Sequence, residues 1–179
     1  MEKKKILFVL VLSLLAVAAS AQFYVGGTVS LEYNDHRESG VKKAYPYYHV
    51  GPELGYQISD FWSVGTSLKL THRPSYADYE SYTSYGVYPY VRASFARVGI
   101  VRFFADASVG FGKDKEGDAK YSTFECSLRP GILVNVKDNL HLIGKTSLLK
   151  YYKEDNEIGY SSFFWGIDDY FEVGLLFYF

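Results

Sequence analysis

The stretch Phe171-Glu172-Val173-Gly174-Leu175-Leu176-Phe177-Tyr178-Phe179 ends the sequence and decides the fold. Every second residue from Phe171 to Phe179 is Phe, Val or Leu, whereas Glu172 and Gly174 fall on the opposite face. An alternation of period two predicts a strand whose two faces meet different environments. Such an apolar strand would aggregate as an exposed edge in water. We therefore expect it to close a barrel whose outside is lipid.

The other end of the sequence has the features of a secretory signal peptide. A mostly basic head precedes an uncharged apolar run from Ile6 to Ala18, and Ala19-Ser20-Ala21 matches the small-residue pattern of a cleavage site. At about 13 residues the run is shorter than the roughly 20 that a spanning helix needs. We expect cleavage between Ala21 and Gln22, which leaves residues 22–179 as one domain.

Composition favours β structure and excludes several other classes. The chain contains 18 Tyr, 13 Phe and 16 Gly, and no later stretch reaches the length of a spanning helix. The formal net charge is −1, so no nucleic-acid partner is expected. Cys126 is the one cysteine, which excludes an internal disulfide framework. Any membrane span must therefore consist of strands.

Period-two alternation predicts about eight strands in an all-β, antiparallel, up-and-down transmembrane barrel. Their expected ranges are 23–32, 45–58, 61–71, 85–95, 100–111, 121–136, 140–151 and the terminal strand. Short turns near 59–60, 96–99 and 137–139 alternate with long polar loops at 34–43, 72–83, 113–120 and 153–162. Short periplasmic turns and long extracellular loops are typical of outer-membrane barrels. Both termini then lie at the periplasmic rim.

Three prolines repeat at one position of the predicted hairpins. Pro52, Pro89 and Pro130 lie on the apolar face of strands that descend toward a short turn. Proline cannot donate to a ladder, and each strand of a closed barrel has two neighbours. We therefore expect a bulge or local bend at each proline.

The alternation alone leaves open whether the apolar face points outward to lipid or inward, as in a soluble lipocalin-like barrel. The opposite face is rich in Gly and Ser, which suit a narrow lumen, and the apolar face is nearly free of charge. We therefore place lipid outside. The expected lumen carries a polar network of mixed sign, formed by Glu32, Glu53, Lys69, Arg92, Arg102, Asp106, Glu125, Arg129, Lys145 and Glu172. Because unpaired buried charge is expensive, these groups should be largely matched and should plug the lumen.

Three motifs and the aromatic terminus carry a family resemblance. Val50-Gly-Pro-Glu-Leu-Gly-Tyr56, Ser59-Asp-Phe-Trp-Ser-Val-Gly65 and Tyr88-Pro-Tyr-Val-Arg92 resemble the small OmpA/OmpX-type outer-membrane β-barrel proteins of Gram-negative bacteria. The resemblance implies export through the periplasm and recognition of the last strand by the barrel-assembly machinery, with Phe177 and Phe179 as the assembly signal. We also expect a monomer surrounded by outer-membrane lipid. No peptidoglycan-binding domain follows the barrel, so a tether to the cell wall is not expected.

The search for chemistry gives little. No cofactor, metal ligand set or catalytic group is expected, because no His or Cys pair has metal-ligand spacing and no nucleophile motif is present. The nearest catalytic candidate is His72 with Ser75, Asp78 and Glu80, which would suit a lipid-modifying enzyme. We expect a non-enzymatic protein with a structural role or a surface-interaction role through its extracellular loops, where a ligand could bind. A small porin-like pore, a lipid-modifying enzyme and a small-molecule-binding barrel remain the alternatives.

Overall fold

The protein is an all-β barrel in a computed structural model that describes residues 22–38, 41–75, 80–155, 159–167 and 171–179, with side chains described outside 31–47. The described residues contain no helix long and apolar enough to span a membrane. The strands are β1 (Gln22–Glu38), β2 (Val41–Gln57), β3 (Trp62–Arg73), β4 (Tyr82–Val98), β5 (Val101–Glu116), β6 (Ala119–Lys137), β7 (Leu140–Thr146), β8 (Leu149–Asp155), β9 (Ser161–Trp165) and β10 (Phe171–Tyr178).

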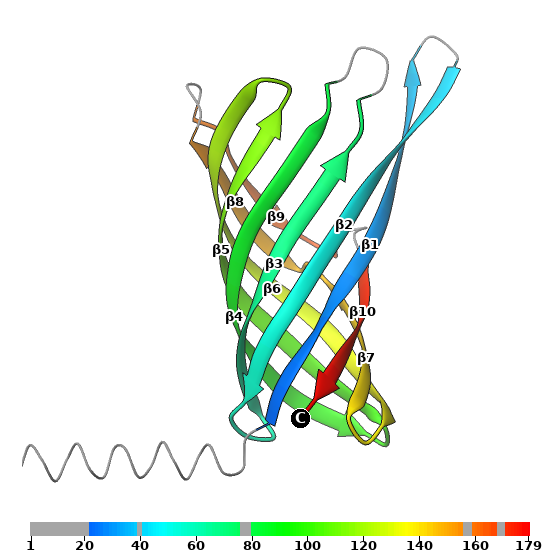
Figure 1. Cartoon of the computed structure of the whole chain (residues 1–179), viewed down its shortest axis with the longest axis vertical. Helices are drawn as coiled ribbons and strands as arrows, with labels where there is room; N and C mark the ends of the chain where they lie inside the picture. Colours follow the sequence, from blue (N-terminus) through cyan, green and yellow to red (C-terminus); the bar gives the residue numbers. More distant parts are fainter. Residues whose placement is uncertain (1–21, 39–40, 76–79, 156–158, 168–170) are drawn as a thin grey trace, which may run out of the picture.

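The terminal strand closes the barrel, as its alternation predicts. Antiparallel neighbours run from β1 to β7 in chain order, and β10 lies between β7 and β1 (Figure 1). The β1–β10 ladder extends from Tyr24 opposite Tyr178 to Val29 opposite Val173, and the Phe179 amide donates to the Phe23 carbonyl at 2.8 Å. The C-terminus and the start of β1 therefore lie together at the rim that carries the short turns.

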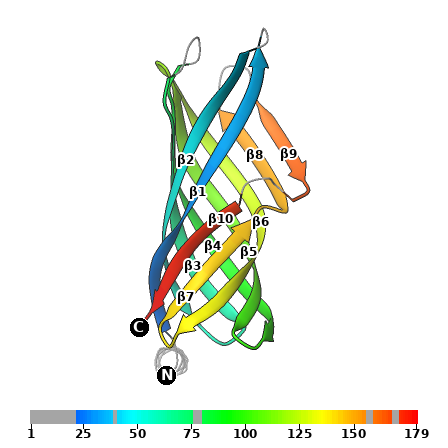
Figure 2. The ribbon, with the colours of Figure 1, turned by 90° about the vertical axis from the view of Figure 1, so that its right-hand side faces the viewer.

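Two of the expected strands are interrupted, and the interruption divides the barrel into two levels. The range 140–151 forms β7 and β8, which both pair with β6, and the last strand forms β9 and β10. Among the described residues, β9 pairs with β8 alone, and β1 beyond Val29 pairs with β2 alone. The ring is thus closed in its periplasmic half, whereas β8 and β9 diverge from β1 in the outer half (Figure 2).

The prolines bear out the expectation of a bulge at only one of three positions. Pro52 and Pro89 each face a short gap in one ladder, but the register is the same on both sides of the gap. Near Pro130, two residues of β6 (129–130) oppose three residues (146–148) between the β6–β7 and β6–β8 ladders, so the register shifts there. The nitrogen of Pro52 and of Pro89 has no hydrogen to donate, so each proline removes one hydrogen bond from the ladder. The register of the strands does not have to change for this. The two other register shifts lie at Phe95 and Val136, next to periplasmic turns.

The prediction of long outer loops at 34–43 and 113–120 is wrong, because most residues of both ranges are paired in strands. The β1–β2 ladder continues to Glu38 opposite Val41, and β5–β6 continues to Glu116 opposite Ala119. Gly117, with φ +57°, supports a two-residue turn in the second hairpin. Polar sequence marks where these strands leave the membrane and does not mark where their pairing ends. The expected turn at 96–99 is also displaced, since β4 continues to Val98 and Gly99 turns the chain with φ +58°.

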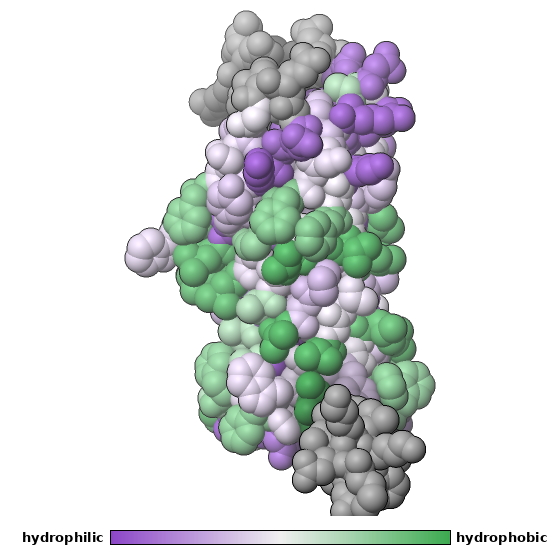
Figure 3. Space-filling view, turned by 90° about the vertical axis from the view of Figure 1, so that its left-hand side faces the viewer, coloured by the Kyte–Doolittle hydropathy of each residue, from purple (hydrophilic) through white to green (hydrophobic). Residues whose placement is uncertain are grey.

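The outward face is apolar and the inward face is polar over most of the barrel. Alternate residues of each strand, such as Val87 and Val91 of β4, are about half exposed. The next residue of β4, Arg92, is on the opposite face of the strand and is buried in the lumen. Hydrophobic residues cover the periplasmic and middle part of the visible face, and hydrophilic residues gather toward the outer end (Figure 3). This belt identifies the membrane-facing surface.

Candidate functional site in the lumen

The periplasmic end of the lumen is filled by a dry apolar layer. Lumen-facing positions of six strands contribute Tyr24, Tyr90, Phe104, Leu133, Ile143, Leu176 and Tyr178, which form one buried cluster. Tyr24, Phe104, Ile143 and Leu176 have no exposed surface at all. Because side chains can fill the interior of a barrel of this size, the described side chains of this layer occupy the lumen at its level.

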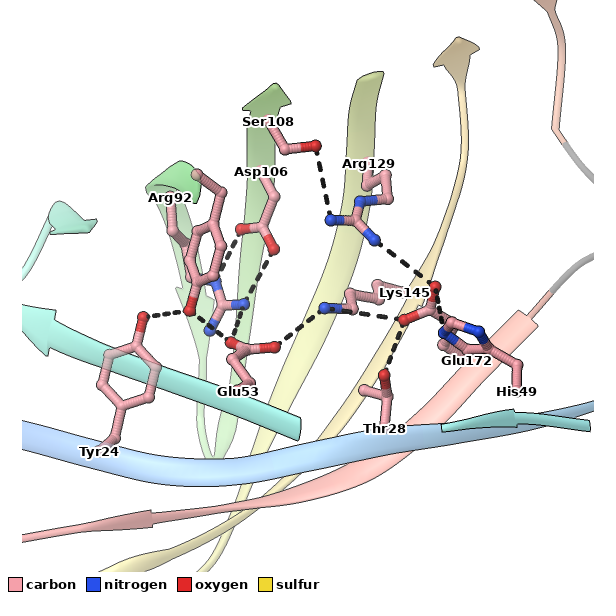
Figure 4. A network of polar contacts seen from close by, with 11 residues as sticks. Tyr24, Thr28, His49, Glu53, Arg92, Asp106, Ser108, Arg129, Lys145 and Glu172 are labelled. Carbon is pink, nitrogen blue, oxygen red and sulfur yellow. Dashed lines mark hydrogen bonds and ion pairs between the residues drawn. The ribbon is translucent and has the colours of Figure 1, made fainter. Parts of the chain in front are cut away.

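A layer of ion pairs centred on Arg92 (Figure 4) adjoins the aromatic layer, whose Tyr90 and Phe104 contact Glu53 and Arg92. Its guanidinium donates to both carboxylate oxygens of Asp106, from Nε at 2.7 Å and from Nη2 at 2.9 Å. Nη2 also donates to Glu53 Oε1 at 2.8 Å, and the group lies 4.3 Å from the centroid of the Phe104 ring. Tyr90 Oη donates to the same Glu53 oxygen at 2.6 Å. A planar donor fork between two carboxylates holds β2, β4 and β5 together across the lumen.

Lys145 connects this centre to a second carboxylate, Glu172 of β10. Lys145 Nζ lies 3.0 Å from Glu53 Oε2 and 3.7 Å from Glu172 Oε2. Thr28 Oγ1 donates to Glu172 Oε2 at 2.8 Å, and Arg129 Nη1 lies 3.5 Å from Glu172 Oε1. His49 Nε2 lies 3.8 Å from the same Oε1 atom (Figure 4). The acidic residue of the terminal strand is therefore linked to β1, β2, β6 and β7.

The charges of this plug balance. Arg92, Arg129 and Lys145 face the carboxylates of Glu53, Asp106 and Glu172, and all six side chains are buried. Buried ions are tolerated when each is paired and hydrogen-bonded. The balanced layer and the aromatic layer below it together close the lumen in its periplasmic half.

A polar vestibule lies above the plug. It has a volume of about 470 Å³ and is lined by residues of β3, β4, β5, β6, β8, β9 and β10. Lys69 and Glu125 face each other there at 3.6 Å, and Lys150 and Glu154 add one charge of each sign. Residues of β8 and β9 line this cavity, and these two strands form the edge that diverges from β1 in Figure 2.

Two tyrosines form hydrogen bonds with Asp114 at the outer rim of the vestibule. Tyr82 Oη and Tyr152 Oη both donate to Asp114 Oδ2, at 2.6 and 2.7 Å. Tyr152 Oη also lies 2.9 Å from Glu154 Oε1. Burial, together with the Asp114 carboxylate, raises the pKa of Tyr82, which stays protonated and keeps donating.

The structure brings most of the expected lumen residues together but separates three of them from the plug. Lys69 and Glu125 lie higher, in the vestibule, and Arg102 lies near the periplasmic rim. The side chain of Glu32 lies outside the described residues. The remaining six form the plug that Figure 4 shows.

Several lumen groups were missed by the sequence reasoning. His49 and Thr28 contact the Glu172 carboxylate region, and the strand parity could have placed His49 inward because Val50 points outward. Parity also places Tyr24, Tyr90 and Phe104 on the inner face, but it gives no sign that the three meet in one layer. In a single strand, an aromatic residue on the polar face appears to break the alternation of polar and apolar residues. In the closed barrel, these aromatic residues form one buried cluster.

The catalytic candidate around His72 does not form a triad in the described residues. His72 is exposed, and its Nδ1 lies 3.1 Å from Thr83 Oγ1. Ser75 and Glu80 are also exposed, and Asp78 lies outside the described residues. Among the described side chains, no three His, Cys, Asp or Glu residues gather as a possible metal site.

The family model for the outer membrane protein beta-barrel domain matches residues 6–168. The chain belongs to this family. The barrel is therefore a protein of the bacterial outer membrane. No curated protein matches the sequence significantly.

Solved structures agree with the barrel fold at low sequence identity. Neisserial surface protein A, from Neisseria, is 10% identical with a TM-score of 0.53, and the alignment covers 89% of this chain and 96% of that one. OprG, an outer membrane protein from Pseudomonas aeruginosa, is 8% identical with a TM-score of 0.50, over 89% and 95% of the two chains. At these identities the likeness supports the barrel fold alone. The function of the protein has to be argued from the residues of its lumen.

Proposed function

We propose that this barrel is a non-enzymatic surface protein that binds a polar ligand at its outer end and does not conduct solutes. The observation that carries the proposal is the contrast along the lumen. A charge-balanced plug and an aromatic layer fill the periplasmic half, whereas an open cavity of about 470 Å³ occupies the outer half.

The vestibule has the size and the lining of a binding site for a small polar molecule. Ligand pockets commonly have volumes of about 300–1,000 Å³ and a few convergent polar groups. Lys69, Lys150 and Glu154 offer charges of both signs, and Tyr82 and Tyr160 offer rings and hydroxyl groups. Tyrosine gives adaptable contact area at low entropic cost. The β1–β2 and β5–β6 hairpins extend the same end of the barrel outward and enlarge the surface open to partners.

We also propose that the barrel inserts as a monomer through the barrel-assembly machinery, which reads Phe177 and Phe179. Both rings point outward, with their centroids 5.1 Å apart, at the end of the strand that closes the ring. Neither ring takes part in the plug, so both are free to be recognised before closure.

Two measurements on the refolded full-length barrel test the functional proposal. In planar bilayers, we expect no steady current from the wild-type protein, and a steady open-state current would overturn the closed-lumen argument. For binding, we expect amide NMR shifts in micelles, with a panel of defined oligosaccharides and short peptides, to fall on vestibule residues. A Lys69→Gln variant should weaken any such binding, whereas Lys137→Gln, at the periplasmic rim, should not. Binding that is equal in both variants would contradict the vestibule as the site.

A further inference from the structure

Asp114 of β5 is a buried carboxylate without an ion pair. It is 2% exposed, and among the described residues no lysine, arginine or histidine nitrogen lies within 4.0 Å of its oxygens. Tyr82 and Tyr152 both donate to the same oxygen, Oδ2. The other oxygen, Oδ1, is buried and accepts no hydrogen bond from the described residues. A buried carboxylate of this kind is costly unless a cation accompanies it.

This carboxylate lies in the wall of the vestibule, whose other charges do not balance it. Three basic and four acidic residues line the cavity, which gives it a formal charge of −1. Lys69 faces Glu125 at 3.6 Å, and Arg129 faces Glu172 at 3.5 Å, so two of the basic groups are paired with other carboxylates. The vestibule therefore has a negative side at Asp114.

Tyrosine rings lie around the same side of the vestibule. Tyr82 comes from β4 and Tyr152 from β8, and Tyr121 of β6 is directly opposite Asp114 in the β5–β6 ladder. Tyr152 Oη also lies 2.9 Å from Glu154 Oε1, so it connects two carboxylates. The face of a tyrosine ring attracts a cation, as a carboxylate does. The arrangement therefore favours a positively charged group in the vestibule.

The chemistry of this corner selects the kind of cation. Asp114 Oδ1 needs a hydrogen-bond donor, which a primary ammonium group has and a quaternary ammonium group lacks. Among the described side chains, no three His, Cys, Asp or Glu residues gather here to ligate a metal ion. The rest of the lining contains hydroxyl side chains, which suit a hydroxylated molecule: Thr71, Ser84, Ser147 and Ser162.

We propose that the vestibule binds a small hydroxylated molecule with a primary ammonium group, such as an amino sugar, and that the ammonium group lies at Asp114. This inference rests on the proposed function and names the class of ligand for the same cavity. The ammonium group donates to the Asp114 carboxylate and balances its charge. Tyr82 and Tyr152 hold the carboxylate in position through Oδ2.

Amide NMR titration of the refolded full-length barrel in micelles tests the proposal with three probes. Glucosamine has the ammonium group and the hydroxyl groups, N-acetylglucosamine has the same ring without the charge, and tetramethylammonium has the charge without an N–H donor. At a pH below the pKa of the glucosamine amine, we expect glucosamine to shift vestibule amides. It should bind about ten-fold more tightly than either of the other probes, because only glucosamine forms the charge-assisted hydrogen bond.

Two matched variants locate the ammonium group. Asp114→Asn keeps the shape of the side chain and an oxygen for the tyrosine hydroxyl groups, but it removes the charge. It should bind glucosamine about ten-fold more weakly and N-acetylglucosamine as the wild type does. Asp138→Asn, the same change in an exposed periplasmic turn, should leave both affinities unchanged. Equal loss of glucosamine binding in the two variants, or no loss in Asp114→Asn, would overturn the assignment to Asp114.

The probes also separate this inference from the proposed function. If N-acetylglucosamine or tetramethylammonium shifts the vestibule amides with the affinity of glucosamine, the ammonium site is wrong, whereas the vestibule remains a binding site. If no probe, oligosaccharide or peptide shifts these amides, both the inference and the proposed function fail. The comparison of probes uses the wild-type barrel, so it decides the question even if heat-modifiable gel migration shows that Asp114→Asn does not fold.

Discussion

Replacing Arg92 with Met removes the centre of the plug while keeping most of its volume. Arg92 supplies both hydrogen bonds that the structure gives to the Asp106 carboxylate, and it also donates to Glu53. Glu53 keeps Tyr90 and Lys145 after the change, whereas Asp106 is left buried with no ion pair. Arg92→Met therefore affects stability chiefly through Asp106.

The magnitude follows from the cost of stranding one buried charge. Removing one partner of a buried ion pair typically costs about 3–5 kcal/mol, and we expect Arg92→Met to lose that much free energy of unfolding. Asp106→Asn should cost less, roughly 1–3 kcal/mol, because Arg92 keeps Glu53. The double variant Arg92→Met/Asp106→Asn removes the stranded charge and should recover much of the loss. The two sites should thus couple by about 2 kcal/mol.

Urea unfolding of the barrel refolded in lipid vesicles measures these differences. Trp62 and Trp165 are the two tryptophans of the chain and report the transition by fluorescence, and heat-modifiable gel migration reports the folded fraction independently. A loss below about 0.5 kcal/mol for Arg92→Met would refute the reasoning. A double variant whose loss equals the sum of the two single losses would refute it equally, because the pair would then not be coupled.

Three further predictions concern packing, pH and assembly. Gly55→Ala should lower the free energy of unfolding by about 1–3 kcal/mol, because a Cβ there would overlap the buried Tyr24 ring; an unchanged urea midpoint would contradict this. Stability should fall as pH rises above about 10, where an unfolded tyrosine loses its proton while Tyr82, whose pKa is raised, keeps its own. Tyr82→Phe should make that fall less steep, and an identical pH profile would show that the Asp114 contact does not matter. Phe179→Ala should slow insertion by the assembly machinery in proteoliposomes while leaving the urea midpoint within about 0.5 kcal/mol, because the ring is 72% exposed; normal insertion would count against the assembly signal.

The barrel topology could be predicted because its signals are local. The alternation from Phe171 to Phe179 describes two faces, and the same parity in every strand places lipid on one side. The ends of the strands were harder to predict from the sequence. Charged residues at 113–116 predicted a loop, yet they are paired with β6, because a hairpin continues as paired strand after it leaves the membrane.

The composition of the lumen could be predicted from parity, but its contacts could not. Glu53, Arg92 and Asp106 were placed on the inner face from the sequence, whereas their bonds connect three strands across the lumen. Partner choice depends on register and on side-chain reach, which no local pattern encodes. The break between β7 and β8 is of the same kind, since it arises where β6 contributes two residues against three beside Pro130.

The two-level construction has a practical consequence for engineering. The residues that bind the ring together lie in its periplasmic half, whereas the β5–β6 hairpin ends in a two-residue turn at Gly117-Asp118, far along the chain from the plug positions of both strands. A guest peptide inserted at that turn extends a hairpin that is already paired and leaves the plug untouched. The barrel is thus suited to carry foreign epitopes on the cell surface, with the plug as a stable base that tolerates changes at the outer end.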